Sequence, residues 1–501
     1  MKGKLSLIIP IYFTVLVVLF LSATGCKPEG PVEPSPDEEI SMYDPSHILD
    51  VFHDDNLRDA VFEQIISAKQ KSKNIPKKKT IEFISAKDLE NVVTLNVSKH
   101  NIKDLYGIQY CKNLTYLNLS GNPNVDLSSL TGLKKLMNLD ITLCELENIS
   151  MLSSDTSLQT LMAGQNKISD ISALSNLHNL KRLYLTLNRI KDVSPLENLG
   201  KLEYLSIRYN SLEDISRMTK NKSIKYLDVN NNKIKSIPDL SEMSNLVELQ
   251  ACQNEIVSVG RIENLTNLQN IYLDENHIIR IAGLSNLPNL NTLSLSSNSI
   301  LSITGVSNVG NLVQLNLSGN FITNVSFISG MPKLKTIWLG GNNIQDLSPL
   351  YNLENPERIG LDGNNVQDVS FIAKFQSLID VSIGNNNIRD ISVLAPLKNL
   401  EALQVQDNLI TDISVITNFK NLTYLDVGNN RIKNFDAIKE LEHLNYLDLG
   451  ATTISDLTPI VECKGMRTNS YLDVNSNPLS ETSKNVQLPL LRESGVYVVY
   501  Y

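Results

Sequence analysis

An asparagine that recurs every 22 residues constrains this chain more than any other feature. Asn occupies 13 consecutive positions at this spacing, from residue 166 to residue 430. The same register continues outward to Cys144, Asn122 and His100, and at the other end to Thr452. Self-similarity at a fixed period of about 20 to 50 residues indicates a solenoid of stacked supersecondary units. One long array therefore accounts for a chain of 501 residues, a length that by itself suggests several domains.

The residues around each Asn repeat as well. Aliphatic side chains stand five and three residues before it, as Leu183 and Leu185 do before Asn188. This alternation predicts a short strand with both side chains buried. The Asn amide is expected to bond backbone groups of its own turn and of the next one, which makes the Asn column a structural ladder. We assign to this ladder Asn122, Asn166, Asn188, Asn210, Asn232, Asn254, Asn276, Asn298, Asn320, Asn342, Asn364, Asn386, Asn408 and Asn430.

The pattern L-x-L-x-x-N-x-I at this period resembles the leucine-rich repeat. Units that carry Asp-Ile-Ser-Pro-Leu-like returns, such as Asp346 to Leu350, resemble those of the internalin group of bacterial surface proteins. The resemblance covers about residues 47–501. It implies an α/β solenoid, a right-handed horseshoe with 22-residue repeats and a parallel concave β-sheet. The convex side is then 3₁₀ or irregular, because 22 residues leave no room for a full helix, and a helical cap covers the N-terminal end.

An acidic column follows the ladder. Asp stands four residues after the ladder position in 10 of 17 repeats. Asp before a tight helical turn accepts hydrogen bonds from free backbone N–H groups, so we interpret the column as caps. A calcium ladder is the alternative, because Asp346, Asp368, Asp390 and Asp412 stack in adjacent coils; calcium needs several oxygens that converge on one point.

The N-terminus has the pattern of a bacterial lipoprotein signal. Two lysines precede an apolar run from Leu5 to Leu21, and small residues lead to Cys26. This resembles a lipobox, in which the cysteine becomes the lipidated first residue, and an ordinary signal peptide is the alternative. The Pro-rich, acidic stretch that follows has too little apolar content to fold. We expect a signal peptide at 1–25, a lipidated Cys and tether at 26–46, an N-terminal cap at 47–91, leucine-rich repeats at 92–462, and the last repeat with a C-terminal cap at 463–501.

The ends of the array need caps, since terminal coils would expose core. Residues from Asp54 to Ala68 have the apolar spacing of an amphipathic helix. A basic loop is expected after it, either solvated or in contact with an anionic surface such as lipid headgroups. Its lysines are Lys69, Lys71, Lys73, Lys77, Lys78 and Lys79. At the far end, a helix-like run to Glu493 and an apolar strand from Val496 to Tyr501 are expected to close the last coil.

Charge and motifs exclude several classes of function. Lys plus Arg is 45 against 54 for Asp plus Glu, and an acidic chain with a net charge of −9 is a poor binder of nucleic acid. The sequence has no Gly-rich phosphate loop, no G-x-S-x-G and no HExxH motif. The six histidines fall in separate repeats or in the cap, without a second ligand at metal spacing. We therefore expect no enzyme, no cofactor and no metal site.

Residues six, four and two before each Asn are expected to face the concave side, where solenoids of this type bind partners. Aromatic and Arg side chains, the usual anchors of protein interfaces, break an otherwise bland surface there. We predict as ligand-binding residues Arg182, Tyr184, Tyr204, Arg208, Tyr209, Tyr226, Tyr272 and Trp338. The alternative is that tyrosines only pack laterally on their neighbours in the sheet, which Tyr116, Tyr424 and Tyr446 in scattered coils favour.

The sequence thus predicts an interaction protein, anchored at the cell surface or envelope, that binds a protein or glycan on its concave face. The internalin resemblance implies adhesion. This chain departs from that group because no immunoglobulin-like domain and no Leu-Pro-x-Thr-Gly signal follow the repeats. The alternative is a structural or scaffolding envelope lipoprotein with no single dedicated ligand. We expect a monomer, held at a membrane by its N-terminal lipid, with no nucleic-acid partner.

Overall fold

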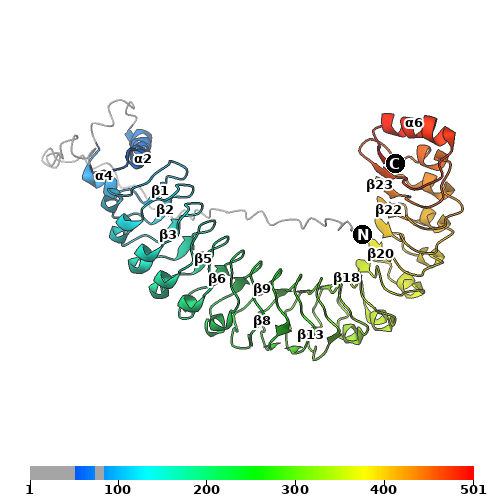
Figure 1. The fold of residues 1–501 in the computed structure, drawn as a ribbon, viewed down its shortest axis with the longest axis horizontal. Coiled ribbons are helices and arrows are strands. Elements are labelled where there is room, and N and C mark those ends of the chain that lie inside the picture. Colours follow the sequence, from blue (N-terminus) through cyan, green and yellow to red (C-terminus); the bar gives the residue numbers. More distant parts are fainter. Residues whose placement is uncertain (1–50, 74–83) are drawn as a thin grey trace, which may run out of the picture.

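The computed structural model describes residues 51–73 and 84–501. The chain winds into a curved solenoid whose long sheet lines the inner, concave side, while turns and short helices lie on the outer side (Figure 1). The two ends of the array lie on opposite arms of the curve, with the helices α2 and α4 on one arm and α6 on the other (Figure 1). Lipid attachment at Cys26 and the tether fall outside the described residues.

The concave sheet has 19 parallel strands, and each pairs with the next coil at a constant register. Leu183 pairs with Leu205, for example, and Leu205 with Leu227. The strands are β1 (Thr94–Asn96), β2 (Tyr116–Asn118), β3 (Asn138–Asp140), β4 (Thr160–Met162), β5 (Arg182–Tyr184), β6 (Tyr204–Ser206), β7 (Tyr226–Asp228), β9 (Glu248–Gln250), β12 (Asn270–Tyr272), β15 (Thr292–Ser294), β17 (Gln314–Asn316), β18 (Thr336–Trp338), β19 (Arg358–Gly360), β20 (Asp380–Ser382), β21 (Ala402–Gln404), β22 (Tyr424–Asp426), β23 (Tyr446–Asp448), β24 (Tyr471–Asp473) and β25 (Tyr497–Val499). The predicted leucine-rich repeat horseshoe with its parallel concave sheet is confirmed.

Each three-residue strand buries its middle side chain and turns the other two toward the concave surface. Leu205 is fully buried, whereas Tyr204 before it is half-buried. The aliphatic residues of the repeat form one continuous core along the whole array. Strand alternation therefore divides every coil into a core column and two surface columns.

Most coils turn on the convex side through a short helix that an Asp or Asn starts. The residue four after the ladder position accepts a hydrogen bond from the backbone N–H two residues on, as Asp192 does from Ser194 at 2.8 Å. These helices are η3 (Ile108–Tyr110), η4 (Ser128–Gly132), η5 (Ser150–Ser154), η6 (Ser172–Asn176), η7 (Ser194–Leu196), η8 (Ser216–Lys220), η9 (Ser326–Gly330), η10 (Ser348–Asn352), η11 (Ser370–Lys374), η12 (Ser392–Leu394), η13 (Ser414–Asn418), η14 (Asp436–Glu440) and, at the C-terminal end, α5 (Thr458–Val461).

Four consecutive coils in the middle of the array differ on this side. They carry Ser236, Ser258, Arg280 and Ser302 where the other coils have Asp or Asn. Without an Asx side chain to accept from the turn, the backbone stays extended and pairs between coils. The resulting short strands are β8 (Ser236–Ile237), β10 (Ser258–Val259), β11 (Ile262–Glu263), β13 (Arg280–Ile281), β14 (Leu284–Ser285) and β16 (Ser302–Ile303).

The N-terminal cap is a helix that the sequence places well but ends too early. Helix α2 (Asp55–Lys73) is capped by Asp54, whose Oδ1 accepts from the N–H groups of Asn56 and Leu57 at 2.9 and 3.1 Å. Its other oxygen accepts from the N–H of Lys103 at 2.7 Å, which ties the cap to the first coil. A short helix, α4 (Ala86–Glu90), follows.

The prediction of a basic loop that starts at Lys69 is wrong in its first half, because α2 continues through Lys73. Lys69 pairs with Asp88 of α4 at 2.8 Å, so this lysine joins the two helices of the cap. The remaining lysines, 77 to 79, lie outside the described residues.

The C-terminal end closes the core. A π-helical turn, η15 (Ser483–Gln487), runs into α6 (Leu488–Glu493), and β25 completes the sheet. Leu488 and Leu491 of α6 are buried against the last coil. The array therefore ends on a helix and a strand that leave no open core.

Candidate binding surface on the concave face

The Asn ladder fixes the position of each strand on the concave side. In a typical coil, Asn342 Nδ2 donates to the carbonyls of Leu317 and Leu339 at 2.9 and 3.0 Å, and its Oδ1 accepts from the N–H of Ile322 at 2.9 Å. Leu317 and Ile322 belong to the preceding coil. The amide thus links its own turn to the preceding coil, whereas the sequence reasoning had placed the second link toward the following one.

The residue before each ladder Asn has left-handed backbone geometry. Leu187 and Tyr209 have φ of 58° and 54°. Gly or Asn often occupies this column, as Gly319, Gly341 and Asn385 do, and these residues adopt positive φ at low cost. This sequence signal was available and was not used. The tight turn carries side chains at this position out of the sheet, so Tyr209 lies at its edge with 42% of its surface exposed.

Three of the predicted tyrosines form one cluster on β5, β6 and β7. The rings of Tyr184 and Tyr204 lie 4.8 Å apart, and those of Tyr204 and Tyr226 lie 6.0 Å apart, both pairs tilted by less than 40°. Burial raises the pKa of Tyr204 to about 12, and the neighbouring charges of Asp228 and Glu248 act in the same direction. Tyr226 keeps 41% of its surface exposed. We call Tyr184, Tyr204 and Tyr226 the tyrosine cluster.

A chain of polar side chains runs beside this cluster. The hydroxyls of Thr186 and Ser206 lie 3.2 Å apart, and Ser206 donates to the Asp228 carboxylate at 2.9 Å. Burial raises the pKa of Asp228. These contacts hold the small residues between the rings in place, so the tyrosines rest on an ordered surface.

Two arginines border the tyrosine cluster. Arg182 stands directly beside Tyr204 in the register of β5 and β6. The guanidinium of Arg208 lies over the ring of Tyr209, 5.1 Å from its centroid. Within residues 51–73 and 84–501, neither arginine forms an ion pair. Both groups are therefore available to a partner.

The other two predicted residues stand apart from the cluster. Tyr272 is on β12, two strands beyond Tyr226, and Trp338 is on β18, three strands further. The indole of Trp338 lies over Gly360 of the next strand, where any side chain would collide with it. The structure thus brings together six of the eight predicted residues and leaves Tyr272 and Trp338 separate.

The sequence reasoning missed a second row of tyrosines on the C-terminal arm. Tyr424, Tyr446, Tyr471 and Tyr497 occupy the same place on the four adjacent strands β22 to β25. Their rings are nearly parallel, with centroid distances of 4.0, 4.7 and 5.8 Å. A three-residue insertion before Asn477 moves Tyr471 out of the 22-residue count, so Tyr424 and Tyr446 wrongly counted as scattered. Correcting the count for that insertion reveals the row.

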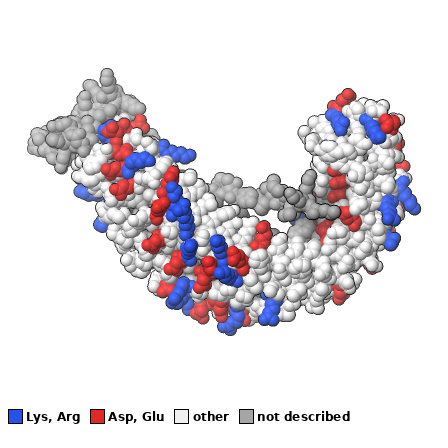
Figure 2. All heavy atoms as spheres, viewed as in Figure 1, with Lys and Arg blue, Asp and Glu red and all other residues white. Residues whose placement is uncertain are grey.

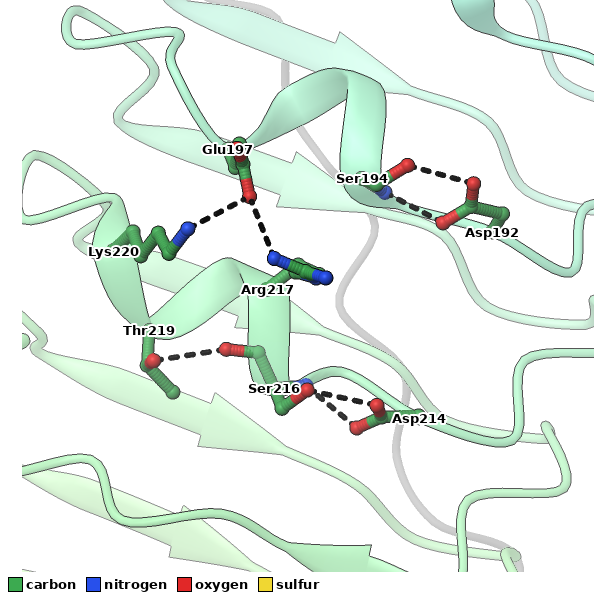
Figure 3. Close-up of polar contacts among 8 residues, drawn as sticks. All are labelled: Asp192, Ser194, Glu197, Asp214, Ser216, Arg217, Thr219 and Lys220. Atoms are coloured by element: carbon green, nitrogen blue, oxygen red, sulfur yellow. Dashed lines mark hydrogen bonds and ion pairs between the residues drawn. The ribbon is translucent and has the colours of Figure 1, made fainter.

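The acidic column on the convex side acts within its own turns. Asp192 and Asp214 each accept from the backbone N–H and the hydroxyl of a serine two residues on, while Glu197 receives Lys220 and Arg217 from the next coil (Figure 3). Hydrogen bonds from the turn lower the pKa of Asp192. In the part of the chain that the structure describes, no three His, Cys, Asp or Glu side chains gather where they could hold a metal ion.

Lys–Glu pairs between adjacent coils make up much of the remaining charge. Lys167–Glu145 and Lys225–Glu203 are examples, at 3.1 and 3.0 Å, and rows of alternating sign run along the N-terminal half of the surface (Figure 2). Exposed pairs of this kind contribute about 0–1 kcal/mol each. They leave the concave aromatic surfaces as the part of the molecule best suited to selective contact.

The repeats match the model of the family described as Leucine Rich repeats (2 copies), over residues 156–198, 200–242, 310–352, 398–440 and 420–462. The chain has the leucine-rich repeat fold. The longest unmatched stretch between these segments, residues 243–309, covers most of the coils with extended convex backbone. No curated protein matches the sequence of this leucine-rich repeat protein.

Solved structures agree with the fold. A leucine-rich repeat protein of Leptospira interrogans is 24% identical, with a TM-score of 0.56 over 82% of this chain and 97% of that one. The functional domain of InlJ from Listeria monocytogenes is 19% identical, with a TM-score of 0.56 over 85% and 81%. The Arabidopsis receptor kinase HAESA, in complex with the peptide hormone IDA and the co-receptor SERK1, is 19% identical, with a TM-score of 0.60 over 87% and 82%.

Proposed function

We propose that this leucine-rich repeat protein binds another protein through the concave surface around the tyrosine cluster. The observation that carries the proposal is the contact of three tyrosine rings on adjacent strands, bordered by two arginines without ion-pair partners. Tyr and Arg are the residues most enriched among the anchors of protein interfaces. The rings offer apolar area, and the guanidinium groups supply directed hydrogen bonds at the border of that area.

The same architecture binds peptides in HAESA, which was solved with a peptide hormone. Leucine-rich repeat proteins typically mediate protein interactions, and no enzymatic constellation competes with that role in the described residues. A glycan is the second ligand class that exposed tyrosines suit, and the test below includes it.

We further propose that the protein is held at a membrane by a lipid on Cys26, with its array displayed on a bacterial surface or envelope. The support is the order of features in the sequence: an apolar run, small residues, Cys26, and then a Pro-rich acidic stretch up to the cap. No helix in the described ranges has the length and apolar character of a membrane span.

The test is a binding screen of the purified protein against arrayed extracellular proteins and glycans, repeated with two variants. Tyr204→Ala with Tyr226→Ala removes two rings of the tyrosine cluster. Tyr424→Ala with Tyr446→Ala is the matched control, because it removes two tyrosines from the same column of the sheet. We expect the first variant to bind the partner at least tenfold more weakly, about 1.4 kcal/mol, and the second to stay within twofold.

Thermal melting separates binding from packing. If the cluster is a binding surface, the first variant keeps a melting temperature close to that of the wild type while it loses affinity. If the tyrosines only pack on one another, the variant melts early and still binds at full affinity, and the proposal fails. A protein that retains no ligand in any arm of the screen would favour the second candidate, a scaffold that spaces its neighbours in the envelope.

A further inference from the structure

The concave face of the C-terminal arm has a second surface whose chemistry differs from that of the tyrosine cluster. Each of Tyr424, Tyr446 and Tyr471 is followed two residues later by an aspartate on the same strand. Strand alternation places both side chains on the concave side, so Asp426, Asp448 and Asp473 form a column beside the row of rings. Acidic side chains gather along the inner side of this arm (Figure 2). We call the tyrosines of β22 to β25 and these three aspartates the acidic tyrosine row.

The aspartates are only partly used within the protein. Oδ1 of Asp426, Asp448 and Asp473 accepts from the backbone N–H two residues on, at 3.0, 2.8 and 2.8 Å. In the described part of the chain, Oδ2 of Asp426 and Oδ2 of Asp448 accept no hydrogen bond, and none of the three carboxylates forms an ion pair. The row therefore presents acceptor atoms and no donor that matches them.

Like charges gather here without compensation. Asp426 faces Asp407 and Asp448, and Asp362 acts on it from further along the sheet. Burial, followed by the charge of Asp448, raises the pKa of Asp426 to about 7. Gly428, at the next surface position of the strand, has no side chain to cover the carboxylates; a Cβ there would lie 3.3 Å from the Asp426 oxygen. Ionised carboxylates left open in this way favour a cation from outside the chain.

The neighbouring strands add two more unmatched acceptors. Asp380 Oδ1 on β20 and Gln406 Oε1 after β21 are buried and have no hydrogen-bond partner among the described residues. Buried acceptors without donors are rare in folded proteins and call for an explanation. Donors from a bound partner would satisfy them.

The register leaves room for one cationic side chain at the start of the row. Asp380, Ala402 and Tyr424 stand side by side on β20, β21 and β22. Ala402 has the smallest side chain at this position of the sheet, so the face of Tyr424 on that side has no ring partner. Strands lie about 4.8 Å apart, so Asp380 and Tyr424 are separated by about 10 Å, which accommodates a guanidinium or ammonium between a carboxylate and an aromatic face.

We propose that this arm binds an extended, arginine- or lysine-rich segment of a partner protein. One cationic side chain lies over Ala402 between Asp380 and Tyr424, and the next ones follow the aspartate column. The four tyrosines span roughly 14 Å, which matches four to five residues of extended chain at about 3.3 Å each. The inference goes beyond the tyrosine cluster, which is bordered by arginines and suits a partner of different charge, and it stands or falls independently of that surface.

The probe is a fluorescently labelled hexa-arginine peptide, and binding to the full-length protein is followed by anisotropy at physiological salt. Hexaglutamine serves as the neutral peptide. Asp426→Asn with Asp448→Asn removes two carboxylates from the row, and Asn keeps an oxygen that can accept from the same backbone N–H, so the turns stay intact. The matched control is Asp346→Asn with Asp390→Asn, which changes the net charge equally on the convex side.

We expect the concave pair to weaken hexa-arginine binding at least tenfold and the convex pair to weaken it less than twofold. Ala402→Leu fills the place beside Tyr424 and should also cost at least tenfold; other strands carry large residues at this position, so the fold tolerates it. The Tyr204→Ala, Tyr226→Ala variant should bind the peptide as the wild type does, which keeps this test separate from that of the tyrosine cluster.

Three results would overturn the proposal. Equal losses from the two aspartate pairs would mean that the peptide responds only to the net charge of the protein. Equal binding of hexaglutamine would remove the role of the cations, and a wild-type protein that fails to bind hexa-arginine would refute the site directly.

Discussion

Replacing one ladder asparagine by alanine tests the account of how the coils are held together. Asn342 is 5% exposed and takes part in four hydrogen bonds with backbone groups. Its three acceptor carbonyls each keep a second donor, in two cases the ladder Asn of a neighbouring coil. The N–H of Ile322 has no other partner among the described residues, so Asn342→Ala leaves one buried donor unpaired.

An unpaired buried donor costs about 1–3 kcal/mol, and the weakened carbonyls add to that cost. We therefore expect Asn342→Ala to lower the free energy of unfolding by about 2 kcal/mol. Asn343→Ala is the matched control, since Asn343 is the next residue, is exposed, and makes no side-chain hydrogen bond in the described structure. Its effect should stay below about 0.5 kcal/mol.

Urea unfolding followed by circular dichroism measures both variants, and hydrogen exchange at the Ile322 amide reports the local effect. Faster exchange at Ile322 should accompany the loss of stability in Asn342→Ala. If both variants lose the same stability, or if Ile322 exchanges as slowly as in the wild type, the ladder does not work through the contacts described above.

Three further predictions concern other parts of the chain. Asp426→Asn should stabilise the protein, because a carboxyl whose pKa rises from 3.8 to about 7 on folding destabilises the folded state once it ionises; the gain should be absent at pH 3, grow between pH 4 and pH 7, and level off at about 2 kcal/mol, less than the full shift of three units because the carboxylate is partly exposed. Coincident stability curves of mutant and wild type across that range would contradict it. Asp192→Ala should cost about 1 kcal/mol by removing the acceptor that starts η7, whereas Asp192→Asn should cost under about 0.5 kcal/mol, as judged by urea midpoints, because Asn148 and Asn324 start the same turn elsewhere. Cys26→Ser should release the protein from the membrane fraction, and a variant that stays membrane-bound after a carbonate wash would place the anchor elsewhere.

The sequence predicts the fold almost completely because one period controls every coil. Aliphatic and Asn columns at fixed spacing identify the core, the strands and the direction of the surface side chains before any coordinate is known. The coils around Ser236 to Ser302 were not anticipated, since their extended convex backbone follows from a missing Asx side chain rather than from a residue that is present.

The candidate sites were harder to predict than the fold. The tyrosine cluster could be read from the strand register, because Tyr204 and Tyr226 stand one period apart. The row from Tyr424 to Tyr497 was lost to a three-residue insertion, which breaks a fixed count although the sheet continues unchanged. The interplanar angles, and the absence of donors for the Asp426 and Asp448 carboxylates, depend on side-chain packing that no period encodes.

The four coils with strands on both sides separate the two aromatic surfaces along the array. Where both sides are paired, the inner and outer spacings are each about 4.8 Å, and equal spacing favours a straighter run than one with a helical turn outside. This stretch then works as a ruler between the arms. Because each coil adds one strand spacing, gain or loss of a 22-residue unit by recombination would change the separation of the two surfaces in steps of about 4.8 Å and leave both intact. The reach of a partner that must touch both arms would be set by the number of coils between them.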